Sequence, residues 1–175
     1  MIIPKELQTS RLLLRPISVK YRQEIFREFT ADITVYMNPQ PAKEIAETDS
    51  FIKNSAKNME NGKEIVMAVL LKDTEEFLGC AGLHEIQTKT PELGIWIKKS
   101  AHGNKYGREA VTALKHWADE NLDYTYIIYP ADKQNVSSRK IAESLGGTVA
   151  REMKNINASG NELDEVEYHI YKLTK

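Results

Sequence analysis

The sequence predicts an α/β fold, or α+β by stricter usage, in which helices flank a mixed sheet. The first observation is a change of hydrophobic period within residues 92–120, where strand-like alternation gives way to helical spacing. The second is that strand-like and helix-like stretches alternate along the chain, and a hairpin pattern closes it. The third is the length of 175 residues without an internal repeat or a linker rich in Pro and Gly, which predicts a single domain over 1–175.

The composition argues against several kinds of partner. The formal net charge is -1, so no overall basic field directs the chain to nucleic acid. No apolar run approaches the length of a membrane span, and the N-terminus lacks the apolar segment of a signal peptide. Cys80 is the only cysteine, so the chain cannot form an internal disulfide, which fits a reducing compartment. We therefore expect a soluble, cytoplasmic protein that binds neither nucleic acid nor membranes.

The N-terminal part predicts one strand and two helices. Residues 7–17 are rich in leucine and form a predicted strand that Pro16 closes. A helix over 18–29 follows, with Ser18 as a candidate N-cap. A second helix over 42–61 comes after the break Asn-Pro-Gln-Pro. The candidate core residues of this second helix are Ile45, Phe51, Ile52 and Met59.

The middle of the chain predicts three strands. Residues 64–71 and 77–86 are expected to pair as a hairpin around a polar turn. Cys80 lies between two glycines of the second strand and is interpreted as a small buried hydrophobe rather than a nucleophile. The next strand, 92–97, is apolar on both faces, which is expected of a strand covered on both sides. Gly94 within it indicates a bulge or a close approach of a ligand to the backbone.

The turn over 102–107 joins this strand to a helix and has the features of an anion site. The first turn of a helix has N–H groups without partners and the positive end of the helix dipole, which together suit a pyrophosphate. Gly103 allows a positive φ and a close approach to a ligand. Positive charge comes from Lys98, Lys99 and Lys105. The same pattern also fits an ordinary strand–turn–helix connection. The apolar stripe of the helix comprises Tyr106, Ala110, Val111, Leu114, Trp117, Ala118 and Leu122.

The C-terminal part predicts a strand, a capped helix and a closing hairpin. Residues 124–129 form an aromatic and β-branched strand that Pro130 ends. Asn135 is a good N-cap for the helix that follows, and Gly-Gly stops that helix. Strands over 148–156 and 165–173 then form the hairpin.

The run LGIWIKKSAHGNKYGREA resembles the acetyl-CoA-binding motif of the GCN5-related N-acetyltransferases, the GNAT superfamily. The family pattern is Gln/Arg-x-x-Gly-x-Gly/Ala, usually followed by Thr-Glu-Ala. His102 takes the Gln/Arg place, Gly107 takes the last Gly/Ala place, and residues 108–110 take the place of Thr-Glu-Ala. Lys105 stands where the central glycine is usual, and Gly103 matches a glycine common in one branch.

A second stretch is similar to the other cofactor motif of this superfamily, Asn-x-x-Ser-x-x-Ile/Leu-x-x-x-Leu-Gly. It is carried by Asn135, Ser138, Ile141, Leu145 and Gly146. In related enzymes the Asn holds the pantetheine arm and the Ser lies near the thioester. The N-terminal run Thr-Ser-Arg-Leu-Leu-Leu-Arg-Pro also looks like the opening of the branch that includes the ribosomal-protein N-terminal acetyltransferases. The resemblance covers most of the chain.

The resemblance implies a mostly antiparallel sheet in which strand 92–97 splays from strand 124–129. Acetyl-CoA is the implied co-substrate, and its pantetheine arm would enter the gap and pair with the backbone of the splayed strand. Its pyrophosphate would lie on the turn over 102–107. No metal ion is expected. The implied cofactor-binding residues are Ile95, Trp96, Ile97, His102, Gly103, Asn104, Lys105, Tyr106, Gly107, Arg108, Asn135 and Ser138.

The implied reaction is direct attack of an amine on the thioester in a ternary complex, for which the amine must first lose a proton. Glu92, at the start of the splayed strand, is the first candidate for the base, and Glu85 and His84 are second. Many GNAT enzymes protonate the leaving thiolate with a Tyr, but Ala142 occupies that place here. Ser138 is the nearest replacement and would hydrogen-bond the sulfur.

The acceptor is expected to be a primary amine, either a protein N-terminus or a small molecule such as a polyamine or an antibiotic. Tyr36, Met37 and the 38–41 loop are substrate-side candidates. The acidic residues of the closing hairpin could attract a cationic amine, although such a run is more often simply solvated. These residues are Glu162, Asp164, Glu165 and Glu167.

Two other functions stay open. A non-catalytic acyl-CoA-binding or sensing module is suggested by Ala142 and Lys105, the two departures from the family pattern. A nucleotide-binding module would use the same phosphate turn but leaves the motif of Asn135 and Ser138 unexplained. A homodimer through the last strands is a further expectation from the family.

Overall fold

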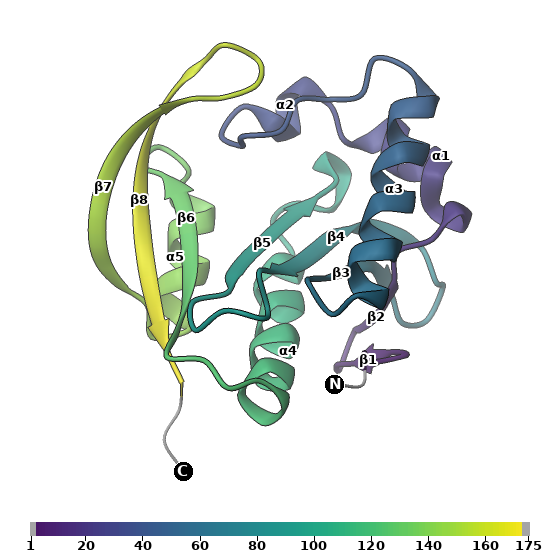
Figure 1. Cartoon of the computed structure of the whole chain (residues 1–175). Coiled ribbons are helices and arrows are strands. Elements are labelled where there is room, and N and C mark those ends of the chain that lie inside the picture. The colour runs from purple at the N-terminus through teal and green to yellow at the C-terminus, as the bar shows by residue number, and fades with distance from the viewer. Residues whose placement is uncertain (1–2, 173–175) are drawn as a thin grey trace.

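The computed structural model describes residues 3–172, which form one eight-stranded sheet flanked by helices (Figure 1). The strand order in the sheet is β1-β2-β3-β4-β5-β6-β8-β7. The strands are β1 (Leu7–Gln8), β2 (Leu12–Pro16), β3 (Ile65–Leu71), β4 (Phe77–His84), β5 (Glu92–Ile97), β6 (Tyr126–Asp132), β7 (Thr148–Ile156) and β8 (Glu162–Tyr171). The helices are η1 (Val19–Tyr21), α1 (Arg22–Glu28), α2 (Ala31–Thr34), α3 (Ile45–Glu60), η2 (Lys99–Ala101), α4 (Tyr106–Asn121) and α5 (Val136–Ser144).

Strands β5 and β6 form a parallel pair that separates after a single register position. Glu92 lies opposite Ile128, and the Ile128 N–H donates to the Pro91 carbonyl at 2.8 Å. Beyond that point the two strands diverge, and Figure 1 shows the gap between their ribbons. The other neighbouring strands pair antiparallel. The predicted fold class, a mixed and mostly antiparallel sheet with a splayed pair, is therefore confirmed.

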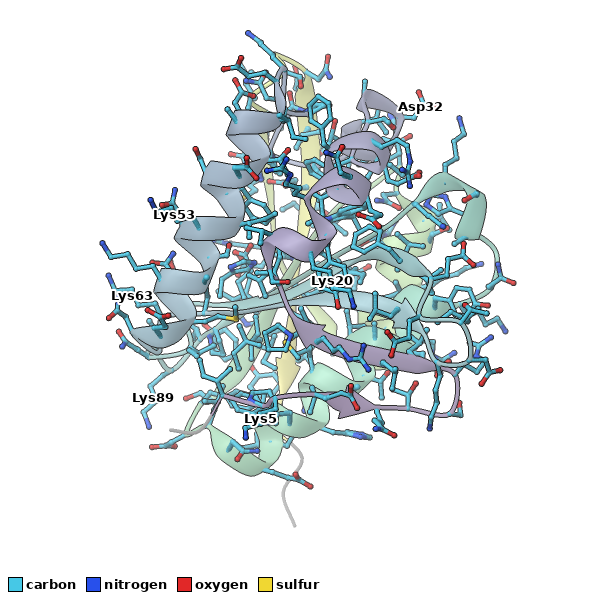
Figure 2. All side chains as sticks on the ribbon, turned by 90° about the vertical axis from the view of Figure 1, so that its right-hand side faces the viewer. Lys5, Lys20, Asp32, Lys53, Lys63 and Lys89 are labelled. Carbon is cyan, nitrogen blue, oxygen red and sulfur yellow. The ribbon has the colours of Figure 1, made fainter. Side chains whose placement is uncertain are left out.

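Two hydrophobic cores cover the two faces of the sheet, and β3 contributes to both by alternation. Met67 points into the larger core, where Leu114 of α4 and Ala142 of α5 are also buried. Its neighbour Val66 points into the smaller core under α1 and α3, together with Ile52. Figure 2 views this second side, where charged side chains cover the solvent face of α3. Continuous apolar strands are expected where helices cover both faces of a sheet.

Cys80 of β4 is a buried part of the smaller core, as predicted. Burial raises the pKa of its thiol, so the reactive thiolate is disfavoured. No helix among residues 3–172 combines the length and the apolar character that crossing a membrane requires.

Several N-terminal predictions need correction. The predicted strand over 7–17 is two antiparallel strands, because the chain turns at Thr9, whose N–H donates to the Leu12 carbonyl at 3.0 Å. The predicted helix over 18–29 begins as the 3₁₀ turn η1, and the Ser18 side chain makes no capping bond. Helix α2 was not predicted. Phe51 of α3 is 42% exposed rather than buried, because α3 turns Ile52 to the sheet instead.

The sequence predicted that Pro130 ends its strand, and this prediction is wrong. Strand β6 continues to Asp132, with Pro130 opposite Glu167 of β8. The N–H of Ile128 points toward β5, so by the two-residue period the nitrogen of Pro130 faces the same way. A proline lacks that N–H, but β5 has already diverged there, so no ladder bond is lost.

The closing hairpin has β7 at the predicted bounds, whereas β8 begins earlier than the predicted strand over 165–173. Leu173 of that prediction lies outside the described residues. One face of the hairpin covers α5, because Tyr168 is buried in the larger core. The other face of β8 carries Glu165 and Glu167, and Glu165 lines the cavity described below, whereas Glu162 and Asp164 alternate onto the face of Tyr168.

Candidate active site

A cavity of about 920 Å³ opens where β5 and β6 separate. Strand β5 and the turn after it form one wall, the end of β6 and the start of α5 form the opposite wall, and residues of the 32–39 segment close a third side. The cavity connects three chemically different regions. These are a turn with free backbone amides, the unpaired edge of β5, and an end lined by carboxylates.

The turn between β5 and α4 presents backbone amides to the cavity. Gly103 has φ +84° and Lys105 has φ +62°, both in the left-handed region that non-glycine residues seldom adopt. The Glu109 N–H is the first in this helix to bond back, to the Lys105 carbonyl at 3.2 Å. The amides of residues 106–108 therefore have no acceptor within the helix. Such amides, with the positive end of the helix dipole, stabilise an anion.

His102 and Asn104 hold the shape of this turn. The His102 ring Nε2 lies 2.6 Å from the Ile97 carbonyl oxygen, which ties the turn to the end of β5. The Asn104 side-chain amide donates to the Ala101 carbonyl at 3.1 Å and to the His102 carbonyl at 3.2 Å. His102 lines the cavity and Asn104 does not. Both side chains therefore stabilise the conformation of the turn through their contacts with backbone carbonyls.

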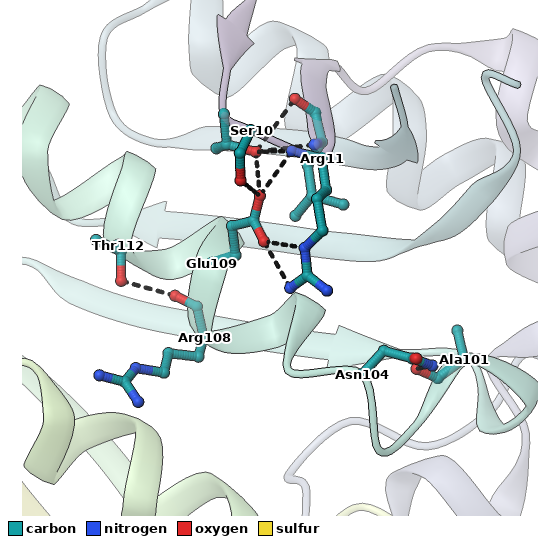
Figure 3. A network of polar contacts seen from close by, with 9 residues as sticks. Ser10, Arg11, Ala101, Asn104, Arg108, Glu109 and Thr112 are labelled. Carbon is teal, nitrogen blue, oxygen red and sulfur yellow. Dashed lines mark hydrogen bonds and ion pairs between the residues drawn. The ribbon is translucent and has the colours of Figure 1, made fainter. Parts of the chain in front are cut away.

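A polar network anchors the first turn of α4 to the N-terminal β-turn (Figure 3). Glu109 accepts from the backbone N–H of Arg11 at 3.0 Å and from its guanidinium Nε at 2.7 Å. It also accepts from the hydroxyls of Thr9 and Ser10. Burial alone would raise the pKa of Glu109, but these bonds outweigh it and hold the pKa below its ordinary value. The carboxylate is thus neutralised beside a site suited to anions.

The positive charge of the site is distributed differently from the sequence prediction. Lys98 donates to Glu76 at 2.6 Å, and Lys99 pairs with Asp32, so both are already engaged with carboxylates. Within residues 3–172, three cationic side chains line the cavity without a carboxylate partner. These are Lys105, Arg108 and Lys140.

The edge of β5 that faces β6 is unpaired beyond its first residue. An unpaired edge offers alternating N–H and C=O groups to an extended ligand. Ile95 and Ile97 pack on the α4 side of the strand. Gly107 leaves room between them and α5, because a Cβ there would lie 3.6 Å from both isoleucines and 3.4 Å from Ile141.

The side chain of Trp96 turns to the other face of the sheet. Its ring packs against Phe29 and Phe77, with centroid distances of 5.0 and 5.8 Å. The part of Trp96 available to an extended ligand along the strand edge is therefore its backbone.

The opposite wall of the cavity carries two hydroxyl groups in contact. Asn135 caps α5, as predicted, and its Oδ1 accepts from the Ser138 N–H at 3.2 Å. This places Ser138 in the first turn of α5, with its Oγ 3.0 Å from the hydroxyl of Tyr129 on β6. Tyr129 is 1% exposed, and burial raises its pKa to about 12. Sequence reasoning treated Tyr129 only as a strand aromatic and missed it as a site residue.

Glu92 lies at the carboxylate-lined end of the cavity. Glu92 is exposed overall, but desolvation by the surrounding cavity walls raises its pKa; His84 opposes this effect, and nearby carboxylates add to it. The largest carboxylate contributions come from Glu85 and Glu165. A carboxylate with a raised pKa is a stronger base, which suits proton removal from an amine.

The two other base candidates are placed less favourably. His84 lines the cavity, but its Nδ1 lies 2.9 Å from an oxygen of Glu64. Glu85 occupies a turn with φ +53° and does not line the cavity. The geometry therefore favours Glu92.

The acidic hairpin residues divide into two kinds, and two of them are buried rather than solvated. Glu167 is 6% exposed and pairs with Arg151 at 2.7 Å. Glu165 is 5% exposed and lines the cavity, and within residues 3–172 it accepts only from the side-chain amides of Asn38 and Asn155. Among the described residues no cation pairs with Glu165. Its negative charge is therefore available to a ligand.

A roof closes the carboxylate-lined end, where the hairpin turn meets the loop after α2. The Ala158 N–H donates to the Asn38 carbonyl at 2.9 Å. The side-chain amide of Asn157 donates to the Met37 carbonyl at 3.1 Å. Tyr36 and Met37, which the sequence suggested as substrate-side residues, line the cavity under this roof. Glu92 and all the implied cofactor-binding residues except Asn104 line the same cavity.

The chain matches a family model described as an acetyltransferase (GNAT) domain over residues 11–148. A comparison with curated protein sequences found no match.

Several solved structures share the fold. RimL, a ribosomal L7/L12 alpha-N-protein acetyltransferase in complex with coenzyme A, superposes with a TM-score of 0.84 at 18% identity over 98% of both chains. A GNAT-family acetyltransferase from Bacillus anthracis gives 0.81 at 21% identity, over 95% of this chain and 98% of that chain. The microcin C7 self-immunity acetyltransferase MccE, in complex with acetyl-CoA and AMP, gives 0.82 at 19% identity over 93% of both chains.

Proposed function

Because the chain belongs to the GNAT acetyltransferase family, we propose that it transfers the acetyl group of acetyl-CoA to a primary amine by direct attack in a ternary complex. One observation carries this proposal. A single cavity has amides and cations at one end and carboxylates at the other, joined by the unpaired edge of β5. A phosphate-bearing thioester and a cationic amine match these two ends by charge.

The residues present fit acetyl-CoA as the co-substrate, which supplies the activated acyl group when bound. The free amides of residues 106–108 suit a pyrophosphate, and Lys105, Arg108 and Lys140 add the charge that further phosphate oxygens require. The edge of β5 offers hydrogen-bonding groups to the two amides of a pantetheine arm.

Glu92 acts as the base in this proposal. An amine reaches the site mostly protonated at neutral pH, and it attacks only after losing that proton. Glu92 receives the proton directly or through one water molecule. Glu165 lies close enough to raise the pKa of Glu92, and its charge concentrates ammonium groups at this end of the cavity.

The acceptor belongs to one of two classes of amine, a protein N-terminus or a small molecule. The name of RimL, an alpha-N-protein acetyltransferase, supports the first class. The complex of MccE with AMP supports a small-molecule acceptor. A homodimer through β7 and β8, and a cytoplasmic location, accompany the proposal as expectations from the family and the composition.

The test is release of free CoA thiol from acetyl-CoA, measured over a panel of small amines and short peptides with free N-termini. We expect turnover with one acceptor class. Glu92→Gln should lower kcat about 100-fold while acetyl-CoA still binds, because general-base catalysis contributes factors of this order.

Glu85→Gln is the matched control, since it removes a neighbouring carboxylate that does not line the cavity. Loss of turnover in Glu85→Gln, with turnover kept in Glu92→Gln, would assign the role of the base to Glu85. Binding of acetyl-CoA without turnover on a broad panel would favour a non-catalytic acyl-CoA-binding module. No binding at all would contradict the proposed function.

A further inference from the structure

The hydrogen bond between Tyr129 and Ser138 has a direction that the surroundings determine. Tyr129 is 1% exposed, and within residues 3–172 its hydroxyl has no partner except the Ser138 Oγ. Ser138 is only partly buried and lines the cavity. A buried donor without an acceptor is costly, whereas a partly exposed one can bond to water or a ligand. The phenol of Tyr129 is therefore the donor and the serine oxygen is the acceptor.

This direction decides where the proton of Ser138 points. Ser138 has one proton, and its oxygen already accepts from Tyr129. No second protein acceptor lies within hydrogen-bond distance of that hydroxyl in the described chain. The proton is therefore free to point into the cavity. A donor that is fixed before the reaction stabilises developing negative charge better than one that must reorient.

We propose that Tyr129 is a positioning residue, whose hydroxyl donates to Ser138 so that the Ser138 proton is directed at the sulfur that leaves the thioester. This inference rests on the proposed function and deepens it. It accounts for the absence of a tyrosine at Ala142, because a tyrosine from β6, on the same wall of the cavity, reaches the first turn of that helix.

In this reaction Tyr129 donates a hydrogen bond but does not transfer a proton. The ammonium group first gives one proton to Glu92, and the neutral amine then forms a C–N bond to the carbonyl carbon. As the C–S bond breaks, the sulfur takes its electron pair and the nitrogen releases its second proton to water. The sulfur is stabilised by the Ser138 O–H and is later protonated from water. Burial raises the pKa of Tyr129 to about 12, so the phenol keeps its proton throughout.

The test is the acidity of the thiol of bound CoA, followed by the ultraviolet absorbance of the thiolate as pH is varied. The wild-type protein should bind CoA with a thiol more acidic than in free CoA. Tyr129→Phe should lower the acid dissociation constant of the bound thiol about fivefold, the effect of one lost hydrogen bond. Ser138→Ala should lower it at least as much, and the double variant should match Ser138→Ala alone.

Two matched variants separate positioning from structure. Tyr126→Phe removes a hydroxyl from the same strand, outside the cavity, and Ser137→Ala removes the neighbouring hydroxyl of the same helical turn. Both should leave the thiol acidity unchanged. In turnover assays Tyr129→Phe should lower kcat with an unchanged KM for acetyl-CoA.

The possible results distinguish this inference from the proposed function. Additive effects of Tyr129→Phe and Ser138→Ala, or a bound thiol that neither variant changes, would overturn the inference while the acetyltransferase proposal stands. Failure of the wild-type protein to bind CoA would overturn both. If Tyr129→Phe does not fold, Ser138→Ala compared with Ser137→Ala still decides whether the Ser138 proton reaches the sulfur.

Discussion

At the scale of single residues, Glu92 should set the pH dependence of the reaction. Its ordinary pKa of 4.5 is raised, chiefly by desolvation at the cavity wall and further by nearby carboxylates, against an opposing effect of His84. The base works only when ionised, so a raised pKa moves the acidic limb of kcat/KM to higher pH than an unperturbed glutamate would give. Measured against pH with an uncharged, poorly basic amine, Glu92→Gln should lose this limb. An unchanged limb in that variant would assign it to another group.

Glu165 should govern affinity for the acceptor rather than for the co-substrate. It is a buried carboxylate that accepts from two amides and faces the cavity. Glu165→Gln keeps the shape and one acceptor oxygen but removes the charge. We expect the KM for a cationic acceptor to rise about tenfold, as for loss of one charge-assisted bond, with the KM for acetyl-CoA unchanged.

Steady-state kinetics with both substrates varied measures this effect. Glu162→Gln, on the same strand but exposed and paired with Lys154, is the matched control. Equal effects of the two variants would mean that only the general charge of the hairpin matters.

Sequence reasoning missed Tyr129 and did not separate Glu165 from the three other hairpin acids that it named, because both roles depend on neighbours in the fold. Hairpin acids are usually solvated, and nothing in the sequence shows that Glu165 turns toward a roofed cavity. Tyr129 fits a strand pattern equally well with or without a functional hydroxyl. Asn135 and Ser138 were identified because their spacing matches the second cofactor motif of the family, and the cap bond between them follows from that spacing.

At the scale of elements, the phosphate turn depends on the network that joins Glu109 to the N-terminal β-turn. Glu109 has a lowered pKa, so its ionised form stabilises the fold. This stability is present above the ordinary pKa of 4.5 and is lost as pH falls through the lower folded-state pKa. Glu109→Gln should therefore destabilise the protein by about 2 kcal/mol at neutral pH.

Chemical denaturation at several pH values tests this prediction. The difference between Glu109→Gln and the wild type should shrink below pH 4.5. Glu120→Gln, an exposed change near the other end of α4, should have little effect. A destabilisation by Glu109→Gln that persists in acid would mean that packing, and not the ionised carboxylate, holds the turn.

The elements that could be predicted are those with a clear local pattern. Strand β5 and the start of α4 lie at the predicted residues, because the hydrophobic period changes at that point. The prediction that Pro130 ends its strand was wrong because β6 can include a proline where β5 has diverged, and that divergence depends on the tertiary structure. The division of the first strand at Thr9 likewise depends on Glu109, which is far away in the sequence.

At the scale of the whole molecule, the sheet works as two halves that meet at a single register position between β5 and β6. Each half supplies one wall of the cavity. Helix α4 provides the amides, and the roof between the hairpin turn and the loop after α2 spans the far end. A ligand that bridges the halves should stabilise the fold, by about 2.7 kcal/mol at a concentration 100 times its dissociation constant.

Calorimetric titration of the wild-type protein with acetyl-CoA, compared with acetyl-pantetheine, tests whether the cavity between β5 and β6 holds acetyl-CoA with its pyrophosphate on the turn over 102–107. Acetyl-pantetheine keeps the thioester and the amides that pair with β5, but it lacks the pyrophosphate and nucleotide. We predict that acetyl-CoA binds with one site per chain and that acetyl-pantetheine binds far more weakly, because the turn and its cations stay unused. Equal affinity for the two, or no binding of acetyl-CoA, would contradict this assignment of the pyrophosphate site.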